Sequence, residues 1–461
     1  MSSLFGRLSI ALRSLLAQEG ALDVTANNVA NVHTPGYSRQ LPILSEAPPL
    51  DTGQISTGNG VEFEGVQSVR DNILELRIDQ ETQQQKRLQS YLSPMNQVQS
   101  LFNETEGADL SDALNQFFNF FQKLADSPRD IPTRQAVISA GQDLASAFQQ
   151  TGQQLKSIQQ GVDQQVRQTV EEINSDTAQL ASLNQQITSV QGNGEHAGML
   201  QERRHSVLHS LSQLVDVAVT YANDGSLTIT TTNGAPLVAD AQSFALSTAA
   251  NPSTGFQDIF SQGNDVTSSF TGGQLAGLLE ARDQAIPCAL SNLDDLAAGF
   301  INAVNTQSQK GYDLDGAQGG DFFQPVVQPS PGSNAGAAAK MAMAITDPSL
   351  TAASSDGTQG SHGNALALAS IQNQAVVNGE TATDYYADLV STIGNEVSSA
   401  TDEEEAVGLA LTQLQNQRSG ISGLSLDEEA SNLILYQRAY EAAAEVVAAI
   451  NDITSEVIQT I

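Results

Sequence analysis

The chain has 461 residues, enough for about two to four domains. Tryptophan is absent and aromatic residues make up only 5% of the sequence, a composition that favours elongated helical packing over compact globular cores. The 52 acidic residues outnumber the 19 basic ones, and the resulting net charge of −33 repels nucleic-acid phosphates and anionic lipids. We therefore expect neither nucleic acid nor a membrane as a partner.

Residues 2 to 31 are predicted to form one amphipathic helix. Its apolar stripe advances mostly by three or four residues and is interrupted at Glu19. The stripe consists of Leu4, Leu8, Leu12, Leu15, Leu22, Ala26 and Val29. Arg7 and Arg13 break the apolar run that a cleaved secretory signal needs, so we expect any export to use a route that reads no such signal.

A helix stop and a chain reversal follow. Asparagine tolerates turn conformations, and a Pro-Gly pair cannot continue a helix. The residues concerned are Asn27, Asn28, Asn31, Thr34, Pro35, Gly36 and Tyr37. The string Ala-Asn-Asn-Val-Ala-Asn, followed by Thr-Pro-Gly-Tyr, resembles the N-terminal signature of the bacterial flagellar axial proteins, the rod, hook and hook-associated family. This resemblance implies that the N-terminal helix pairs with a C-terminal helix in the innermost layer of a tube.

The segment from 40 to 69 is rich in Pro, Gly, Ser and Thr with short β-branched runs, and we expect one or two strands there. Long glutamine-rich stretches with apolar positions at helical spacing come next. The predicted helices are 73–102, 109–125, 133–158, 162–190 and 199–214.

At residue 215 the period changes from helical to alternating. Val217, Val219 and Tyr221 alternate with polar residues, and turn sequences at 223–225 and 233–234 predict a small antiparallel β module. Residues 272–310 are predicted to be helical. Residues 311–358 are predicted to form a loop-and-strand region, in which 340–345 is the best candidate strand. Further helices are predicted at 364–376, 384–400 and 403–420.

The last predicted helix runs from Leu426 to Ile461 without proline or glycine. Its stripe is Leu426, Ala430, Leu433, Tyr436, Tyr440, Ala444, Val447, Ile450, Ile453, Val457 and Ile461. Because this stripe matches that of the N-terminal helix, we expect the two termini to pair as a coiled coil and to form an assembly interface. The alternative is two amphipathic surface helices packed on a core.

Later motifs select one group within the flagellar family. The stretches 272–279, 311–316 and 422–430 resemble those of the hook-associated proteins at the hook-filament junction. The resemblance implies a structural, non-enzymatic protein without cofactors that leaves the cell through the flagellar type III apparatus and is located in the extracellular flagellum. The implied partners are further copies of the chain in a ring, the hook protein, a second hook-filament junction protein, and a cytoplasmic export chaperone on the C-terminal helix.

Three possible chemical sites are weighed against structural explanations. Residues 313–321 superficially resemble a calcium loop, but the fifth, sixth and twelfth positions lack the required ligands and glycine, so an Asp/Gly turn is preferred. His205 and His209 have the spacing of two zinc ligands but lack a third ligand and a catalytic glutamate. Cys288, the single cysteine, cannot form an intramolecular disulfide. We expect no active site and no metal site.

The predicted fold is mainly α: an elongated multi-domain protein with paired N- and C-terminal helices, a body of long bundled helices and a small inserted antiparallel β module. The predicted domains are 1–60 with 427–461, then 61–214 with 272–310 and 362–426, and an outer β-rich domain of 215–271 with 311–361. The alternative function is a secreted helical-stalk protein whose β module acts as an adhesin or hydrolase.

Overall fold

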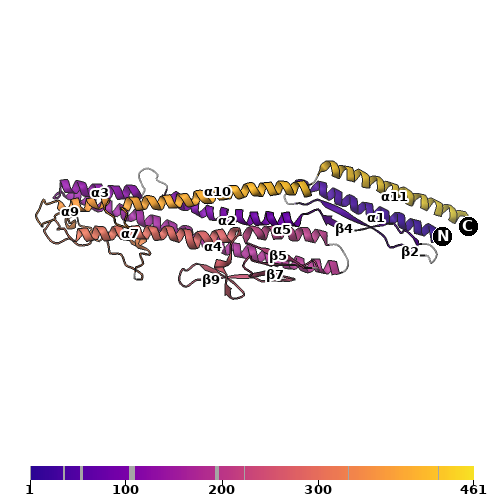
Figure 1. Cartoon of the computed structure of the whole chain (residues 1–461), viewed down its shortest axis with the longest axis horizontal. Coiled ribbons are helices and arrows are strands. Elements are labelled where there is room, and N and C mark those ends of the chain that lie inside the picture. Colours follow the sequence, from indigo (N-terminus) through magenta and orange to yellow (C-terminus); the bar gives the residue numbers. More distant parts are fainter. Residues whose placement is uncertain are drawn as a thin grey trace.

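A computed structural model describes residues 2–34, 37–51, 56–102, 110–192, 197–222, 224–330, 332–423 and 425–460. The molecule is a long rod with both termini at the same end (Figure 1). We call α1, β1 to β4 and α11 the terminal part, and the remaining elements the body. The predicted mainly helical, elongated fold is confirmed.

The body is built on long helices that run along the rod. They are α2 (Asn72–Phe102), α3 (Leu110–Asp126), α4 (Ile131–Gly192), α5 (Gly198–Leu214), α7 (Ile286–Ser308) and α10 (Ala382–Ser422). At the end of the rod far from the termini, Phe117 lies at the centre of a cluster of buried rings, 5.0 Å from Phe121 and 5.3 Å from Phe300. Burial of each such ring stabilises the fold by about 1.5–3 kcal/mol.

In two places, a pair of helices that the sequence predicted as separate is one continuous helix in the structure. Residues 133–158 and 162–190 both belong to α4, because Gly161 is the one weak helix former between them and an isolated glycine costs only about 1 kcal/mol. Residues 384–400 and 403–420 both belong to α10, which Thr381 caps by accepting a hydrogen bond from the Asp384 amide.

The predicted β module is present as two small antiparallel sheets. One contains β5 (Ala218–Tyr221), β6 (Leu227–Thr230), β7 (Pro236–Ala239) and β8 (Gln242–Ser243). The other contains β9 (Leu246–Ala250), β10 (Gln257–Ser261) and β11 (Asn264–Asp265). Both lie against α4, where the Asn174 side chain holds the backbone of Leu246 through two hydrogen bonds of 2.8 Å.

The predicted helix 272–310 contains one irregular turn. It consists of α6 (Gly273–Glu280), a π-helical turn at Ala281–Ala285, and α7. The π turn contains Arg282, a fully buried side chain that donates to Asp163 of α4 at 2.8 Å and to Asp283 at 2.7 Å. π-helical turns are rare and occur mostly as single turns inside α-helices, as here.

The strand predicted at 340–345 is wrong. Instead α8 (Ala337–Lys340) ends there, and Met343 makes only an isolated bridge to Phe323. The Asp294 carboxylate accepts from the backbone amides of Gly336 and Ala338, which favours a helical turn at this point. Within 311–361, Phe322 and Phe323 pack in the helical core, whereas the sequence had grouped this segment with the strands. The domain boundaries remain predictions.

Short helical elements complete the body. They are 3-10 turns at Thr267–Ser269 and Pro348–Leu350, α9 (Gly363–Ser370) and a 3-10 turn at Ile371–Asn373. The last two cover most of the predicted helix 364–376. No helix in the described ranges is both long and apolar enough to span a membrane.

The terminal part contains both predicted terminal helices, α1 (Ser2–Ala30) and α11 (Leu426–Thr460). Between α1 and the body the chain forms the antiparallel pair β1 (Gln40–Glu46) and β4 (Val61–Ser68), and a smaller pair, β2 (Leu50–Asp51) and β3 (Ser56–Thr57). The sequence predicted one or two strands in 40–69, and the described residues of this segment form four short strands.

Candidate assembly site on the paired terminal helices

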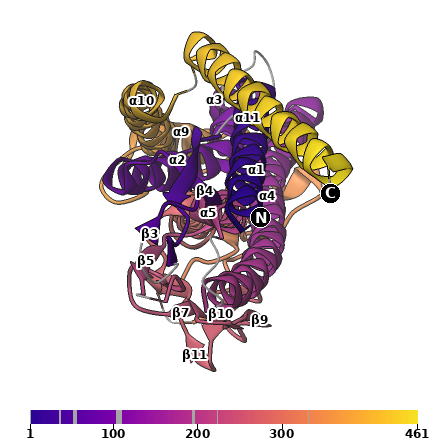
Figure 2. The same ribbon diagram turned by 90° about the vertical axis from the view of Figure 1, so that its right-hand side faces the viewer.

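Helices α1 and α11 lie side by side at one end of the rod (Figures 1 and 2). The β1–β4 hairpin also packs against α1. The close approach of α1 and β4 depends on Gly20, because a Cβ atom there would lie 2.8 Å from the Phe63 ring of β4. Arg13 adds an ion pair of 2.9 Å to Glu62. The N-terminal helix thus has two neighbours within its own chain.

The buried face of α1 is built from small residues. Ala11, Ala17, Ala21 and Val24 are buried, and small side chains let neighbouring backbones approach closely. The predicted stripe is displaced from this face: Leu8, Leu15 and Leu22 are half-buried, whereas Leu12, Ala26 and Val29 are exposed. The Leu4 side chain lies outside the described part. The predicted stripe omitted the buried alanines Ala11, Ala17 and Ala21.

On α11 the predicted stripe follows the packed face more closely. Ile450 is buried, and five members are half-buried, namely Leu433, Tyr436, Tyr440, Ala444 and Val447. Leu426, Ala430 and Ile453 are exposed. The Val457 side chain and Ile461 lie outside the described residues. Ala443, which the prediction omitted, is buried.

A polar cluster joins the ends of α1, β1 and α11. Asn28 is fully buried, and its amide donates to the Gln40 carbonyl at 2.8 Å and to Glu429 of α11 at 3.0 Å. Its side-chain oxygen accepts from the Gln40 amide at 3.0 Å and from the Tyr37 hydroxyl at 3.0 Å. One asparagine therefore connects three segments, two of them from opposite ends of the sequence.

Glu429 also binds Arg39. The Arg39 guanidinium donates to Glu429 at 2.8 Å and to Glu428 at 2.6 Å. The sequence explained these carboxylates only as the first turn of the terminal helix, with Ser425 as its cap. Ser425 does accept from the Glu428 amide, at 3.4 Å. The role of Arg39 was missed, and the only sequence signal for it was an arginine close after the motif.

The other motif residues stabilise the turn after α1. The Asn31 amide donates to the Asn27 side chain at 2.9 Å, and the Thr34 hydroxyl donates to Asn31 at 3.1 Å. Pro35 and Gly36 lie outside the described residues. Burial, together with the charges of Glu202 and Glu429, raises the pKa of Tyr37 to about 12. Tyr37 therefore stays neutral and acts as a hydrogen-bond donor.

The two histidines considered as zinc ligands bind carboxylates of α2. His205 lies 3.4 Å from Glu75, and His209 lies 2.8 Å from Asp79. Glu75 also lies 3.6 Å from Arg418 of α10. In the part of the chain that the structure describes, no group of three or more His, Cys, Asp or Glu side chains is arranged to hold a metal ion.

The segment considered as a calcium loop is a turn. The Asp313 carboxylate accepts from its own chain, from the amides of Asp315 at 2.9 Å and Ala317 at 2.8 Å. Cys288 is exposed on α7.

Models of known protein families match three segments of this chain. Residues 95–323 match the family described as flagellar hook-associated protein FlgK helical domain. Residues 8–37 match flagella basal body rod protein, and 415–460 match the C-terminal family of flagellar basal body rod FlgEFG protein. Flagellar hook-associated protein 1 of Bacillus subtilis (strain 168) is 30% identical, over 99% of this chain and 98% of the relative. The chain belongs to the flagellar hook-associated protein 1 family.

Other members of the flagellar hook-associated protein 1 family match over the same length. The Salmonella typhimurium (strain LT2) protein is 27% identical over 98% of each chain. A solved structure of the flagellar hook junction protein FlgK from Burkholderia pseudomallei has the same fold, with a TM-score of 0.67, 21% identity, and coverage of 75% of this chain and 100% of that one. The family resemblance stated from the sequence is confirmed.

Membership of the hook-associated protein 1 family makes the chain a structural component of the bacterial flagellum at the hook-filament junction. The two rod-protein families match the segments that form α1 with its following turn and α11. The alternative function, a stalk carrying an adhesin or hydrolase, has no support in these findings.

Proposed function

We propose that this chain forms a ring of its own copies between hook and filament, and that α1 and α11 make the contacts of that ring. The observation that carries the proposal is a second apolar stripe on α11, on a face that α1 leaves uncovered. It runs in steps of three and four residues, as a helix-packing seam does. Its members are Leu435, Ala442, Val446, Ala449 and Ile453, which are exposed, and Ala439, which is half-buried.

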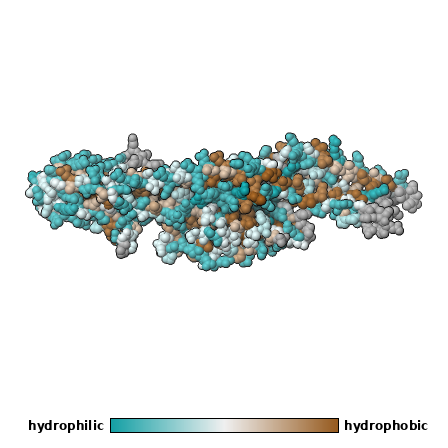
Figure 3. Space-filling model, in the orientation of Figure 1, coloured by the Kyte–Doolittle hydropathy of each residue, from teal (hydrophilic) through white to brown (hydrophobic). Residues whose placement is uncertain are grey.

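The exposure of this stripe is high for side chains of its kind. Leu435 is 61% exposed, Val446 50% and Ile453 47%. Apolar side chains lie along the terminal helices in the surface view (Figure 3). Contiguous exposed apolar surface marks a protein contact, and each large side chain buried in the ring would contribute about 1.5–3 kcal/mol. Leu12 and Leu16 of α1, also exposed, are further candidates for the contact.

The finer parts of the proposal rest on family membership. The ring would sit between the hook protein and a second junction protein, and a cytoplasmic chaperone would cover the exposed stripe of α11 until export through the flagellar type III apparatus. We further propose that the chain has no catalytic activity. Its division into a terminal domain (1–60 with 427–461), a helical body and an outer β-rich domain belongs to the same proposal.

Complementation of a strain that lacks the chain tests the proposal. We expect Val446→Glu, on the exposed stripe, to leave the monomer folded and to abolish filaments while hooks remain, because a charge would be buried between copies. Val327→Glu is the matched control, since Val327 is 75% exposed but lies in the body. Measuring how much of each variant is secreted into the medium distinguishes a defect in assembly from a defect in export. Normal filaments with Val446→Glu would overturn the proposal.

A further inference from the structure

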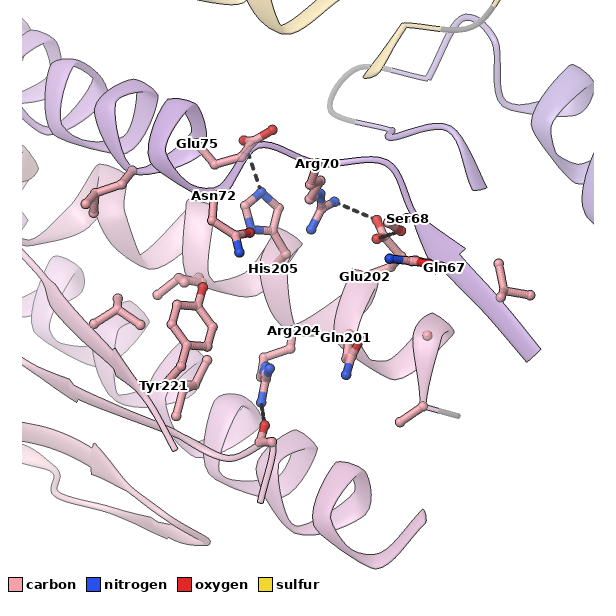
Figure 4. Close-up of a pocket in the computed structure, with 18 of the residues that line it drawn as sticks. Gln67, Ser68, Arg70, Asn72, Glu75, Gln201, Glu202, Arg204, His205 and Tyr221 are labelled. Atoms are coloured by element: carbon pink, nitrogen blue, oxygen red, sulfur yellow. Dashed lines mark hydrogen bonds and ion pairs between the residues drawn. The ribbon is translucent and has the colours of Figure 1, made fainter. Parts of the chain in front are cut away.

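Apolar side chains are exposed on the body where α2 begins. They are Ile73 and Leu76 of α2 and Tyr221 of β5, with exposed fractions between 47% and 70%. All three line one cavity of about 850 Å³, and Tyr221 lies on the β5 side of it (Figure 4). In the surface view, apolar side chains gather over the start of α2 and α5 (Figure 3). Exposed apolar surface that adjoins a cavity is typical of a protein contact.

A positive charge adjoins these apolar residues. Arg77 follows Ile73 by four residues, so both lie on the same face of α2, and Arg77 is exposed. Within the described residues Arg77 has no hydrogen-bond or ion-pair partner. It is thus available to a carboxylate of another molecule. We call Ile73, Leu76, Arg77 and Tyr221 the α2 patch.

A second exposed surface, on α10, has the complementary composition. Leu409 is 67% exposed, and Glu405 lies one turn before it on the same face of the helix. Asp402 extends this face by a further turn and is also exposed. In the part of the chain that the structure describes, neither carboxylate has a hydrogen-bond or ion-pair partner. We call Asp402, Glu405 and Leu409 the α10 ridge.

The two acidic residues between Asp402 and Glu405 have a different role. Glu403 accepts a hydrogen bond from Gln84 of α2 at 2.7 Å, and Glu404 accepts one from Gln89 at 2.8 Å. These two carboxylates connect α10 to α2 within the chain. The carboxylates of the α10 ridge therefore remain for a contact outside it.

The α2 patch and the α10 ridge do not meet within one chain. The two helices pack on each other through other faces, where Leu411 of α10 lies against Leu74 and Ile78 of α2. Contact between the patch and the ridge thus requires two copies. Because the two surfaces differ, such a contact is heterologous, and it continues from copy to copy around a ring instead of closing a dimer.

We propose that the α10 ridge of one copy docks on the α2 patch of the next copy. Leu409 enters the cavity beside Tyr221, and the Glu405 carboxylate pairs with Arg77. The inference rests on the proposed ring and adds a second interface to it, made by the bodies. Since each copy carries a net charge of −33, the copies repel one another, and opposite charges that face each other favour this arrangement over others.

Disulfide cross-linking in assembled filaments tests the contact. In a Cys288→Ser background, one strain would produce Ile73→Cys and Leu409→Cys as two separate copies, so that a disulfide between these positions joins two chains. We expect a dimer after mild oxidation of isolated filaments with their hooks, and only when both variants are present. The matched control pairs Leu409→Cys with Leu366→Cys, an exposed leucine of α9, and should give no dimer.

Charge exchange gives an independent test. We expect Glu405→Arg to reduce the number of filaments per cell severalfold, because two positive charges would then face each other. The double variant Arg77→Glu with Glu405→Arg should restore the filaments. Asp388→Arg, at an exposed position of the same helix, is the control and should change little.

Normal filament numbers with Glu405→Arg, or filaments that contain both cysteine variants and give no dimer, would overturn the proposal. Cross-links from Ile73→Cys to a different protein would assign the α2 patch to that partner instead. If the cysteine variants built no filaments, the charge exchange alone would decide the question. The Val446→Glu test stays separate: loss of filaments there without a dimer here refutes the body contact and leaves the ring.

Discussion

Asn28 makes more contacts between distant segments than any neighbouring residue of its motif that the structure describes. It uses both its amide and its carbonyl oxygen to join α1, β1 and α11. The motif around it could be identified from the sequence, but its partners could not, because Gln40 and Glu429 lie 12 and 401 residues away.

The first prediction concerns this asparagine. Asn28→Ala removes the side-chain donor of the buried Gln40 carbonyl and of one Glu429 carboxylate oxygen, while Arg39 still binds the other oxygen, and this loss costs about 1–3 kcal/mol in the terminal part. We expect faster amide hydrogen exchange in α1 and α11 and unchanged exchange in α4. Asp23→Ala, at an exposed position of α1, is the control and should change little. Equal exchange in the two variants would contradict the assigned role.

Glu75 gives a prediction about pH. Burial raises the pKa of its carboxyl, but the hydrogen bond from His205 and the positive charges of Arg418, His205 and Arg70 outweigh burial and lower it. The folded protein thus binds this proton less tightly than the unfolded chain does. The stability contributed by Glu75 is present above the ordinary glutamate pKa of about 4.3 and is lost as pH falls through the lowered value.

Urea unfolding from pH 7 to pH 3 measures this contribution. We expect the difference in unfolding free energy between the parent protein and Glu75→Gln to be largest near neutral pH and to shrink as the pH falls below about 4.3. Glu171→Gln, at an exposed position of α4, should give a small difference that does not depend on pH. A constant difference for Glu75→Gln would show that its charge contacts do not stabilise the fold.

At the scale of elements, local periodicity predicted most helices but not the face that α1 buries. The apolar stripe of α1 was placed on its leucines, whereas the buried face consists of alanines and Val24, because α1 packs closely against both α11 and a hairpin. At the predicted strand 340–345, Asp294, far away in the sequence, binds the amides of Gly336 and Ala338 just before the segment and favours the helical turn α8, which ends at Lys340. Contacts between distant residues decided both cases.

Two glycines allow a test of helix packing. Gly277 of α6 lies against α2, and a Cβ atom there would lie 2.0 Å from the Arg87 carbonyl oxygen. Gly161 of α4 has no heavy atom within 4 Å of such a Cβ. We expect Gly277→Ala to lower the melting temperature, and Gly161→Ala to raise stability by about 0.5–1 kcal/mol through helix propensity. A higher melting temperature for Gly277→Ala would contradict the close approach of α6 and α2.

At the scale of the whole molecule, different interactions stabilise the body and the terminal part. The body buries a continuous apolar core, including the phenylalanine cluster, whereas the terminal part depends on a helix pair, a hairpin and polar contacts. The pairing of the two termini was predicted from the sequence, because both stripes have helical spacing. Apart from Ile453, the second stripe of α11 was not predicted, because the sequence alone does not show which apolar face of a helix is buried and which is exposed.

A cryo-electron-microscopy structure of the assembled hook-filament junction measures the central claim directly. We predict that Leu435, Val446 and Ile453 are buried there against terminal helices of neighbouring copies, with the α1–α11 pair of each chain retained. A junction in which this stripe of α11 faces solvent, and in which neighbouring copies touch only through their bodies, would contradict the account.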